Sequence, residues 1–358
     1  MSDDAANVSA PAFLTKLVQQ AEHLCASDIH LQMLGKEAQV SLRLDGMMSP
    51  PTNVPEPLAE RLVGRIKYLS KLKTYQESLP QDGRIDKGEV GANSDIRVAT
   101  YPTVTGEKIV LRFFTQTEQP RLEELQLPRA TVTELGRFLR SQSGLLLLTG
   151  PAGSGKTTTI YACLRELAAV GGRHVITIED PVEQIIPGLM QTEVSDARGL
   201  TFAKAARHLL RQDPQVLVIG EIRDDETADI VVRAAMTGHL VISTLHAGSC
   251  RGVVERLLTM CSDDYAVSAA LELILNQRLM RRVCSECGGR RCEACAQTGY
   301  RGRVPVVEWL RFDSAQREQL RDRGPSIAEP KHNVADAARE LVRSGVTDSA
   351  EFERIFSR

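Results

Sequence analysis

The spacing of apolar residues divides the chain into a short first part with mixed patterns and a longer second part in which strands and helices alternate. In the first part, apolar residues recur at helical spacing over 13–24 and 58–69, which predicts two amphipathic helices. Apolar and polar positions alternate between them up to Asp45-Gly46, as in a half-buried hairpin. Further short strands are expected at 81–84, 96–98 and 109–113. These elements predict a small α+β domain over residues 1–117.

A polar linker at 118–128, with prolines near both ends, is expected to separate this domain from the second part of the chain. From residue 129 onward, apolar runs alternate with amphipathic segments, which is typical of a parallel sheet with helical crossovers. Strands are expected at 145–149, 174–178, 216–219 and 240–244, and helices at 158–169, 202–210 and 226–236. The stretch 253–280 is predicted to be largely helical, and a strand-like segment at 304–309 and polar helices follow. The second part, 129–358, therefore predicts an α/β fold.

The strand at 145–149 runs directly into a glycine-rich segment that matches G-x-x-x-x-G-K-[ST] position by position. Its glycines let successive backbone N–H groups converge on a phosphate, and the following helix adds the partial positive charge of its N-terminus. Lys156 is expected to bridge the β- and γ-phosphates, and the Thr157 hydroxyl to hold Mg²⁺. A glycine-rich turn before a helix is the alternative, but strand, loop, lysine, threonine and helix all stand in register. The predicted nucleoside triphosphate site consists of Gly150, Pro151, Ala152, Gly153, Ser154, Gly155, Lys156, Thr157 and Thr158.

Acidic residues and histidines accompany the other predicted strands of this part, whose carboxyl ends form the edge where open α/β sheets bind ligands. Glu179 ends the second strand, where a carboxylate could orient the water that attacks a γ-phosphate; an acid that caps a helix before a proline is the alternative. Glu221 ends the third strand and is expected to face Mg²⁺ or its water shell. His239 and His246 stand at the two ends of the fourth strand, either as sensors of the γ-phosphate or as structural histidines.

Composition narrows the classes of function. The chain has 358 residues, a formal net charge of −2 and 4% aromatic residues, which gives no signature of nucleic-acid binding. It contains no apolar run of membrane-spanning length and no charged-then-apolar leader, so a cytoplasmic protein is expected.

Four of the eight cysteines form two C-x-x-C pairs close together in the sequence. Four thiolates at this spacing can surround Zn²⁺ tetrahedrally, and Gly288 and Gly289 supply the flexibility that a tight return between the pairs needs. Free thiols are the alternative, because the return between the pairs is short. The predicted metal ligands are Cys284, Cys287, Cys292 and Cys295.

Taken together and in this order, the blocks of the second part resemble the type II secretion and type IV pilus assembly ATPases of the secretion ATPase superfamily. In that family the blocks are the Walker A, Asp box, Walker B and His box, which are matched here by 150–157, 179–183, 220–224 and 237–246. The first domain carries matching motifs, which are Ala26-Ser-Asp-Ile-His, Arg43-Leu-Asp-Gly, Gln81-Asp-Gly-Arg, Asp95-Ile-Arg and Pro102-Thr-Val-Thr-Gly-Glu-Lys. The resemblance covers nearly the whole chain and implies a RecA-like P-loop domain preceded by a small PAS-like domain.

The resemblance also implies roles for individual residues. Glu179 becomes the catalytic carboxylate and Glu221 the Walker-B acid, and the implied cofactors are ATP, Mg²⁺ and a structural Zn²⁺ on the four cysteines. Four arginines are implied to face phosphate, where a guanidinium can neutralise the charge of the γ-phosphate. They are Arg84 and Arg97 in the first domain, and Arg207 and Arg211 before the third strand of the second.

The function implied is that of a cytoplasmic motor that hydrolyses ATP to power assembly of a type IV pilus or a type II secretion pseudopilus. As such a motor, the chain is expected to form a homo-oligomer, a hexameric ring. It is also expected to lie at the inner membrane through a platform protein and to have no nucleic-acid partner.

The sequence departs from this family in two places. The return between the cysteine pairs is shorter than usual, and only about 25 residues precede the Ala26 motif, so the extra N-terminal domain of many assembly ATPases is not expected here. The first alternative is pilus retraction or a related secretion ATPase, although retraction ATPases lack the four cysteines. The second alternative is a nucleotide-dependent binding switch with little turnover.

Overall fold

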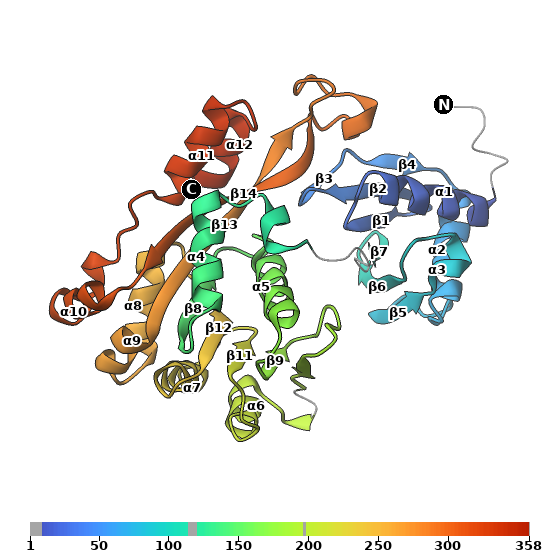
Figure 1. Ribbon diagram of the computed structural model, residues 1–358. Coiled ribbons are helices and arrows are strands. Elements are labelled where there is room, and N and C mark those ends of the chain that lie inside the picture. The colour runs from blue at the N-terminus through green and yellow to red at the C-terminus, as the bar shows by residue number, and fades with distance from the viewer. Residues whose placement is uncertain (1–8, 114–119, 196–197, 358) are drawn as a thin grey trace. The chain divides into compact units, whose positions relative to one another are not determined.

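The computed structural model describes residues 9–113, 120–195 and 198–357, which belong to two compact units (Figure 1). The first unit is formed by Met1–Glu118 with Arg281–Gly302, and the second by Gln119–Met280 with Arg303–Arg358. The four-cysteine segment thus groups with the first unit. The domain limits drawn from the sequence stay a prediction.

The predicted linker begins outside the described residues, and the part that is described packs onto the second unit. Its 3-10 turn η2 (Leu122–Leu125) buries Leu122, and Leu127 is buried in the same core. The segment from residue 120 to residue 128 is therefore anchored by apolar contacts, although its sequence is mostly polar.

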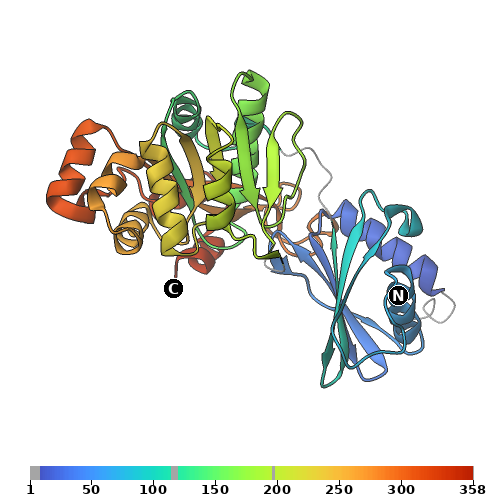
Figure 2. The ribbon, with the colours of Figure 1, turned by 90° about the horizontal axis from the view of Figure 1, so that it is seen from below.

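The first unit is built on a sheet with the strand order β3-β2-β1-β7-β6-β5, in which β4 also pairs with β2. Apolar residues at alternate strand positions, such as Ile29, pack against Leu14 and Leu62 of the helices. Figure 2 shows these helices on one face of the sheet. The elements are α1 (Ala10–His23), β1 (Asp28–Leu34), β2 (Glu37–Leu44), β3 (Met47–Met48), β4 (Thr52–Val54), α2 (Leu58–Leu69), β5 (Gln81–Ile85), α3 (Lys87–Val90), β6 (Ile96–Thr103) and β7 (Gly106–Phe113). The predicted α+β character of this part is confirmed.

The second unit is a sheet of order β10-β9-β11-β12-β8-β13-β14 with helices on both faces, and its strands from β10 to β13 run parallel. Helices α4 and α5 belong to the core on one face, and α6 to α9 to the core on the other. The elements are α4 (Arg129–Leu139), β8 (Gly144–Thr149), α5 (Lys156–Val170), β9 (Val175–Glu179), β10 (Met190–Glu193), α6 (Phe202–Leu209), β11 (Val216–Ile219), α7 (Asp225–Met236), β12 (Leu240–Thr244), α8 (Cys250–Met260), α9 (Asp264–Ala270), β13 (Leu271–Val283), β14 (Tyr300–Arg311), α10 (Ser314–Arg323), α11 (Val334–Arg343) and α12 (Ser349–Phe356). The predicted α/β fold with a parallel sheet is confirmed.

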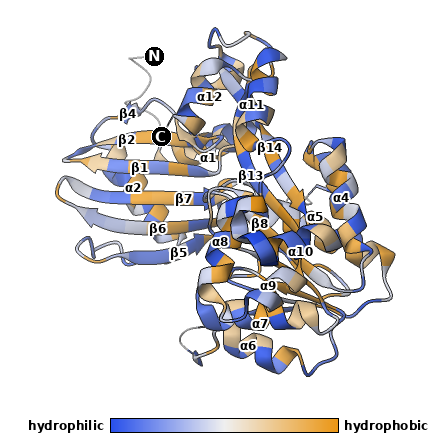
Figure 3. Ribbon diagram, turned by 90° about the vertical axis from the view of Figure 1, so that its left-hand side faces the viewer, coloured by the Kyte–Doolittle hydropathy of each residue, from blue (hydrophilic) through white to orange (hydrophobic). Residues whose placement is uncertain are grey.

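Burial on both faces explains why the central strands are apolar at every position. Leu145 and Leu147 of β8 enter the core beneath α6 to α9, whereas Leu146 and Leu148 enter the core beneath α4 and α5. In the first unit, where the described helices cover one face of the sheet, hydrophobic and hydrophilic positions follow one another along β1, β6 and β7 (Figure 3). The two patterns agree with the α+β and α/β character predicted for the two parts of the chain.

The prediction that 253–280 is largely helical is wrong in its second half. Helix α8 and the short α9 end at Ala270, and β13 then runs from Leu271 to Val283 beside the central strand β8. Leucine, methionine, arginine and glutamine favour helices by intrinsic propensity, and this stretch contains few β-branched residues. Pairing with β8 therefore overrides the local preference.

Candidate nucleotide-binding site

The glycine-rich loop joins the fully buried strand β8 to α5 at the carboxyl edge of the parallel sheet. Gly150 has a φ of 135°, and a Cβ there would lie 2.2 Å from the backbone oxygen of Gln277. Gly155 caps α5 in the left-handed conformation, with a φ of 89°. Only glycine fits both positions, so the loop holds a backbone path that brings its N–H groups together at the start of the helix.

Lys156 and Ser154 carry the polar groups of this loop. The Lys156 Nζ donates to the carbonyl oxygens of Gly150 (2.8 Å) and Pro151 (3.0 Å). Burial lowers the pKa of Lys156, and the charge of Glu221 opposes this effect. The buried Ser154 Oγ has no hydrogen-bond partner among the described residues. An ammonium bent over the loop and an unused hydroxyl within it fit a phosphate-binding loop, and Thr157 lies exposed in the first turn of α5.

Gln277 of β13 holds the loop from the side, a role that the sequence did not reveal. This side chain is 3% exposed. Its Oε1 accepts a hydrogen bond from the Thr159 hydroxyl (2.9 Å), and its Nε2 donates to the Ser154 carbonyl (2.8 Å). One amide thus joins the loop to the first turns of α5. A strand prediction for this stretch would have placed Gln277 beside the loop.

Glu179 ends β9 and is nearly buried, with 8% of its surface exposed. Its carboxylate accepts hydrogen bonds from the hydroxyls of Tyr161 and Thr177 (2.6 Å for Thr177) and from Gln191 Nε2 (3.1 Å). Burial and the hydrogen bond to Glu179 raise the pKa of Tyr161. Burial, with the charge of Glu179, also raises the pKa of Glu183. The structure therefore fixes the Glu179 carboxylate in one orientation at the end of its strand.

Glu221 lies at the carboxyl edge, two residues after β11, where Arg223 links it to the neighbouring strand end. Arg223 pairs with Glu221 and donates from Nη2 to Asp180 Oδ2 (3.1 Å). The His246 Nε2 is 3.7 Å from Glu221 Oε2. The structure thus brings Glu221, His246 and the end of β9 together. Arg223 belongs to the Walker-B block, but the sequence assigned it no role.

His239 is not brought to this edge. It precedes β12, and its Nδ1 lies 3.0 Å from the Ala234 oxygen at the end of α7. His246 follows the same strand, so the length of β12 separates the two histidines. Thr149, the last residue of β8 before the P-loop, exchanges hydrogen bonds with Ala247 (2.8 and 2.9 Å). The end of β12 that carries His246 therefore lies beside the P-loop. Within this unit His239 thus lies a strand length from the P-loop, and its role as a γ-phosphate sensor stays a prediction.

Arg207 lies on α6 and Arg211 two residues after it, and both side chains are exposed. Arg207 pairs with Glu226 at the start of α7, and Arg211 Nη1 donates to the Arg207 oxygen (2.7 Å). Among the described residues, neither has a hydrogen bond or ion pair with the P-loop. Their exposure leaves both guanidinium groups accessible to another molecule.

Arg84 and Arg97 belong to a row of charged residues on the open face of the first unit. Register pairs each with the next, from Arg84 (β5) through Arg97 (β6), Arg112 (β7) and Asp28 (β1) to Arg43 (β2), and we call these five residues the arginine row. Asp28 is 2% exposed and pairs with Arg112 (2.7 Å) and Arg43 (3.3 Å). Burial alone would raise the pKa of Asp28, but hydrogen bonds from Arg112 and Ser27 hold it below its ordinary value. A buried carboxylate therefore fixes two arginines beside the two that the sequence singled out.

The four predicted metal ligands lie together, with their sulfur atoms within 4.8 Å of one another. Cys284 and Cys292 are 3.9 Å apart at sulfur, as are Cys287 and Cys295. Gly288 and Gly289 both have positive φ values, 57° and 84°, so the short return closes as a tight turn. Backbone N–H groups of Cys292 and Gly299 point at the Cys295 sulfur (3.2 and 3.3 Å). Four converging sulfurs with N–H donors to one of them fit the donor set of a tetrahedral zinc centre.

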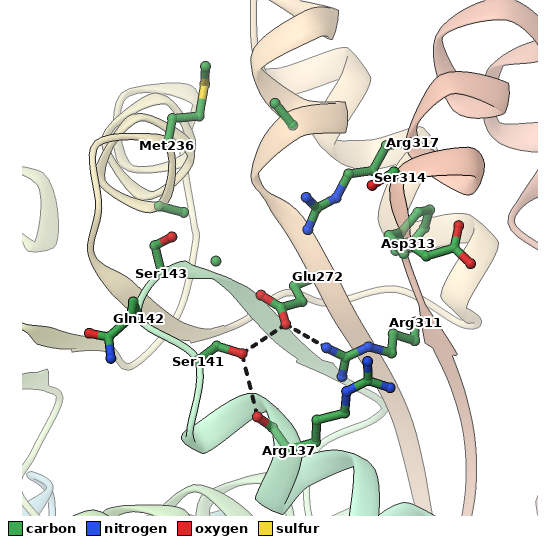
Figure 4. A pocket seen from close by; sticks show the side chains of 14 residues that line it. Arg137, Ser141, Gln142, Ser143, Met236, Glu272, Arg311, Asp313, Ser314 and Arg317 are labelled. Atoms are coloured by element: carbon green, nitrogen blue, oxygen red, sulfur yellow. Dashed lines mark hydrogen bonds and ion pairs between the residues drawn. The ribbon is translucent and has the colours of Figure 1, made fainter.

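A cavity of about 560 Å³ lies at the amino ends of the strands of the second unit, opposite the edge that carries the P-loop (Figure 4). Its lining includes Gly144, the first residue of β8, and Glu272, the second residue of β13. Glu272 accepts hydrogen bonds from Ser141 Oγ (3.0 Å) and Arg311 Nη2 (2.7 Å). The cavity is thus a strand length away from the P-loop and has no part in the nucleotide site.

Within the three described stretches of chain, none of the helices combines the length and the apolar character needed to cross a bilayer.

Comparison with known proteins then places the chain. A sequence profile described as "Type II/IV secretion system protein" matches residues 3–354.

Two curated relatives agree with that match, and one solved structure shares the fold. The protein transport protein HofB homolog of Haemophilus influenzae is 37% identical over 352 residues, 96% of this chain and 73% of that protein. Type II secretion system protein HxcR of Pseudomonas aeruginosa is 38% identical over 358 residues, 96% of this chain and 76% of that protein. The X-ray structure of the Legionella pneumophila ATPase DotB shares the fold, with a TM-score of 0.75, 23% identity and coverage of 100% of this chain and 98% of that one. The chain belongs to the type II/IV secretion system protein family.

Proposed function

We propose that this chain is a motor ATPase that hydrolyses ATP to power assembly of a type IV pilus or a type II secretion pseudopilus. The proposal is carried by the convergence of the P-loop, Glu179, Glu221 and His246 at one edge of one parallel sheet. This edge combines backbone and ammonium donors for phosphate with carboxylates that can hold water or a metal ion.

Each group has a distinct task in this proposal. The loop from Gly150 to Thr158 binds the phosphates, and Lys156 exchanges its contacts to loop carbonyls for contacts to phosphate oxygens. Thr157 and Glu221 would hold Mg²⁺, which would neutralise phosphate charge. Glu179, fixed by Tyr161 and its neighbours, orients the attacking water.

The partners are also part of the proposal. Arg84 and Arg97 of one subunit, with the exposed Arg207 and Arg211, serve the nucleotide of a neighbouring subunit in a hexameric ring. The four cysteines hold one structural Zn²⁺, which favours assembly over retraction. The ring works in the cytoplasm, bound to a platform protein of the inner membrane, without nucleic acid.

Phosphate release tests the proposal. Lys156→Ala is expected to weaken both ATP binding and turnover, whereas Glu179→Gln keeps binding and slows hydrolysis by about a hundredfold or more. Glu193→Gln is the matched control, because Glu193 lies opposite Glu179 in register on β10 but is exposed. Its Oε1 accepts a hydrogen bond from the Val182 N–H (3.0 Å), which an amide oxygen can also accept, so turnover should stay within about threefold of wild type. Equal turnover of Glu179→Gln and wild type would exclude the role of Glu179. A wild-type protein that binds ATP without releasing phosphate would identify a binding switch instead.

A further inference from the structure

A buried carboxylate on β14 lies at the meeting point of three elements of the second unit. Glu308 is 3% exposed. Its Oε1 accepts hydrogen bonds from the backbone N–H of Cys250 (2.9 Å) and from Asn276 Nδ2 (3.0 Å). Its Oε2 accepts a hydrogen bond from the backbone N–H of Val334 (2.9 Å). Cys250 and Val334 are the first residues of α8 and α11, so one carboxylate is bound by the N-termini of two helices.

From Glu308, a chain of hydrogen bonds leads to the nucleotide site. Asn276 also donates to the Gly248 oxygen (3.1 Å), in the loop that carries His246. The neighbouring Ala247 exchanges hydrogen bonds with Thr149, the last residue of β8 before the P-loop. Asn276 directly precedes Gln277, whose amide holds the Ser154 carbonyl. Every link is direct and lies within the second unit.

We propose that Glu308 is a positioning residue for ATP hydrolysis, which sets the His246 loop and β13 against the P-loop and couples them to the C-terminal helix α11. This inference rests on the proposed function. Glu308 touches neither nucleotide nor metal and acts through Asn276 and the loop after β12. Because α11 begins on the same carboxylate, a displacement of the C-terminal helices reaches the His246 loop through Glu308.

The chemistry of the site requires a carboxylate rather than an amide. Three N–H donors converge on Glu308, and an ionised carboxylate offers acceptors only. The NH₂ group of a glutamine would face either the Val334 N–H or the N–H groups of Cys250 and Asn276. Two donors would then meet, so the hydrogen bonds on that side of the side chain must break. The charge also interacts favourably with the positive ends of α8 and α11, which an amide does not replace.

Glu308→Gln in the full chain tests the proposal, with Glu272→Gln as the matched control. Glu272 is also a buried carboxylate of this sheet, but it lies at the opposite edge beside Ser141 and Arg311. We expect Glu308→Gln to lower kcat about tenfold while KM for ATP stays within about threefold, because positioning is lost and not binding. Amide hydrogen exchange over residues 245–252 should accelerate about tenfold in the same variant. In Glu272→Gln, kcat and this exchange should stay within about twofold of wild type.

Asn276→Ala is the second variant, because it leaves Glu308 with both backbone partners. It should lower kcat by about three- to tenfold, and the double variant should lose less activity than the product of the two single losses, since both residues act on the same loop. A lower melting temperature with unchanged kcat and unchanged exchange over 245–252 would reduce Glu308 to a purely structural role. An equal loss of kcat in Glu272→Gln would also overturn the proposal. Absence of turnover in the wild type would refute the proposed function, while the exchange measurement would still decide whether Glu308 positions the loop.

Discussion

Replacing Gln277 by leucine tests whether β13 holds the P-loop in its ATP-binding conformation. The substitution keeps the approximate volume of the side chain but removes both hydrogen bonds. The Thr159 hydroxyl and the Ser154 carbonyl then lose their partner in the interior. The apolar side chain cannot restore either contact, so the loop is free to leave the conformation in which its N–H groups converge.

The size of the effect follows from these two groups. A buried polar group left without a partner costs about 1–3 kcal/mol, and the low end applies here because the loop can relax toward water. Two groups give about 2 kcal/mol. If this cost falls on the binding-competent conformation, ATP affinity drops by about 30-fold, since 1.4 kcal/mol corresponds to a factor of ten. Thr159→Val removes only one of the two bonds and should weaken affinity about fivefold.

Titration with a fluorescent ATP analogue measures the affinities, and a thermal melt verifies that each variant is folded. Gln215→Leu is the control, because the Gln215 Oε1 accepts a hydrogen bond from the His174 N–H at the end of the sheet opposite the P-loop. Its affinity for ATP should equal that of the wild type. A folded Gln277→Leu protein that binds ATP within threefold of wild type would refute the argument.

Three further predictions concern the first unit. Protein purified without added zinc or chelator should contain about one Zn²⁺ per chain, and Cys287→Ser should lose the metal and melt earlier while its folded fraction still hydrolyses ATP; zinc near zero, with four readily titrated thiols, would contradict this. Mixing Arg97→Ala with Lys156→Ala protein should restore partial ATPase activity if the arginines act across subunits, and mixed rings without rescue would argue against that. Asp28→Asn should destabilise the protein most at neutral pH, because the lowered pKa of Asp28 in the folded state stabilises the fold above pH 3.8, the ordinary pKa of aspartate. This contribution disappears as the pH falls through the lower pKa of the folded state. Denaturant melts from pH 7 to pH 3 measure the difference in stability between variant and wild type, and a difference that does not change with pH would contradict the prediction.

The parts of the fold and site that depend on local pattern could be predicted from the sequence. The apolar run of β8, the glycines after it and the acids at Glu179 and Glu221 are each visible within a few residues. Strand β13 could not be predicted in this way, because its leucines and arginines favour a helix and only pairing with β8 makes it a strand. Gln277, Asn276 and Glu308 were missed for the same reason: their roles arise from contacts between segments that are distant in the sequence.

The arginine row also restricts how the length of the first unit can change. Arg97 lies on the open face of β6, while its neighbours Ile96 and Val98 are buried on the other. Inserting or deleting one residue within this strand would exchange the two faces, drive a guanidinium into the core and leave an isoleucine in water. Length variation among related chains should therefore collect at the tip between β6 and β7, near Val104, or occur within strands in steps of two. In a deep mutational scan with single-residue insertions, tolerance should be high at that tip and should fall sharply at Arg97.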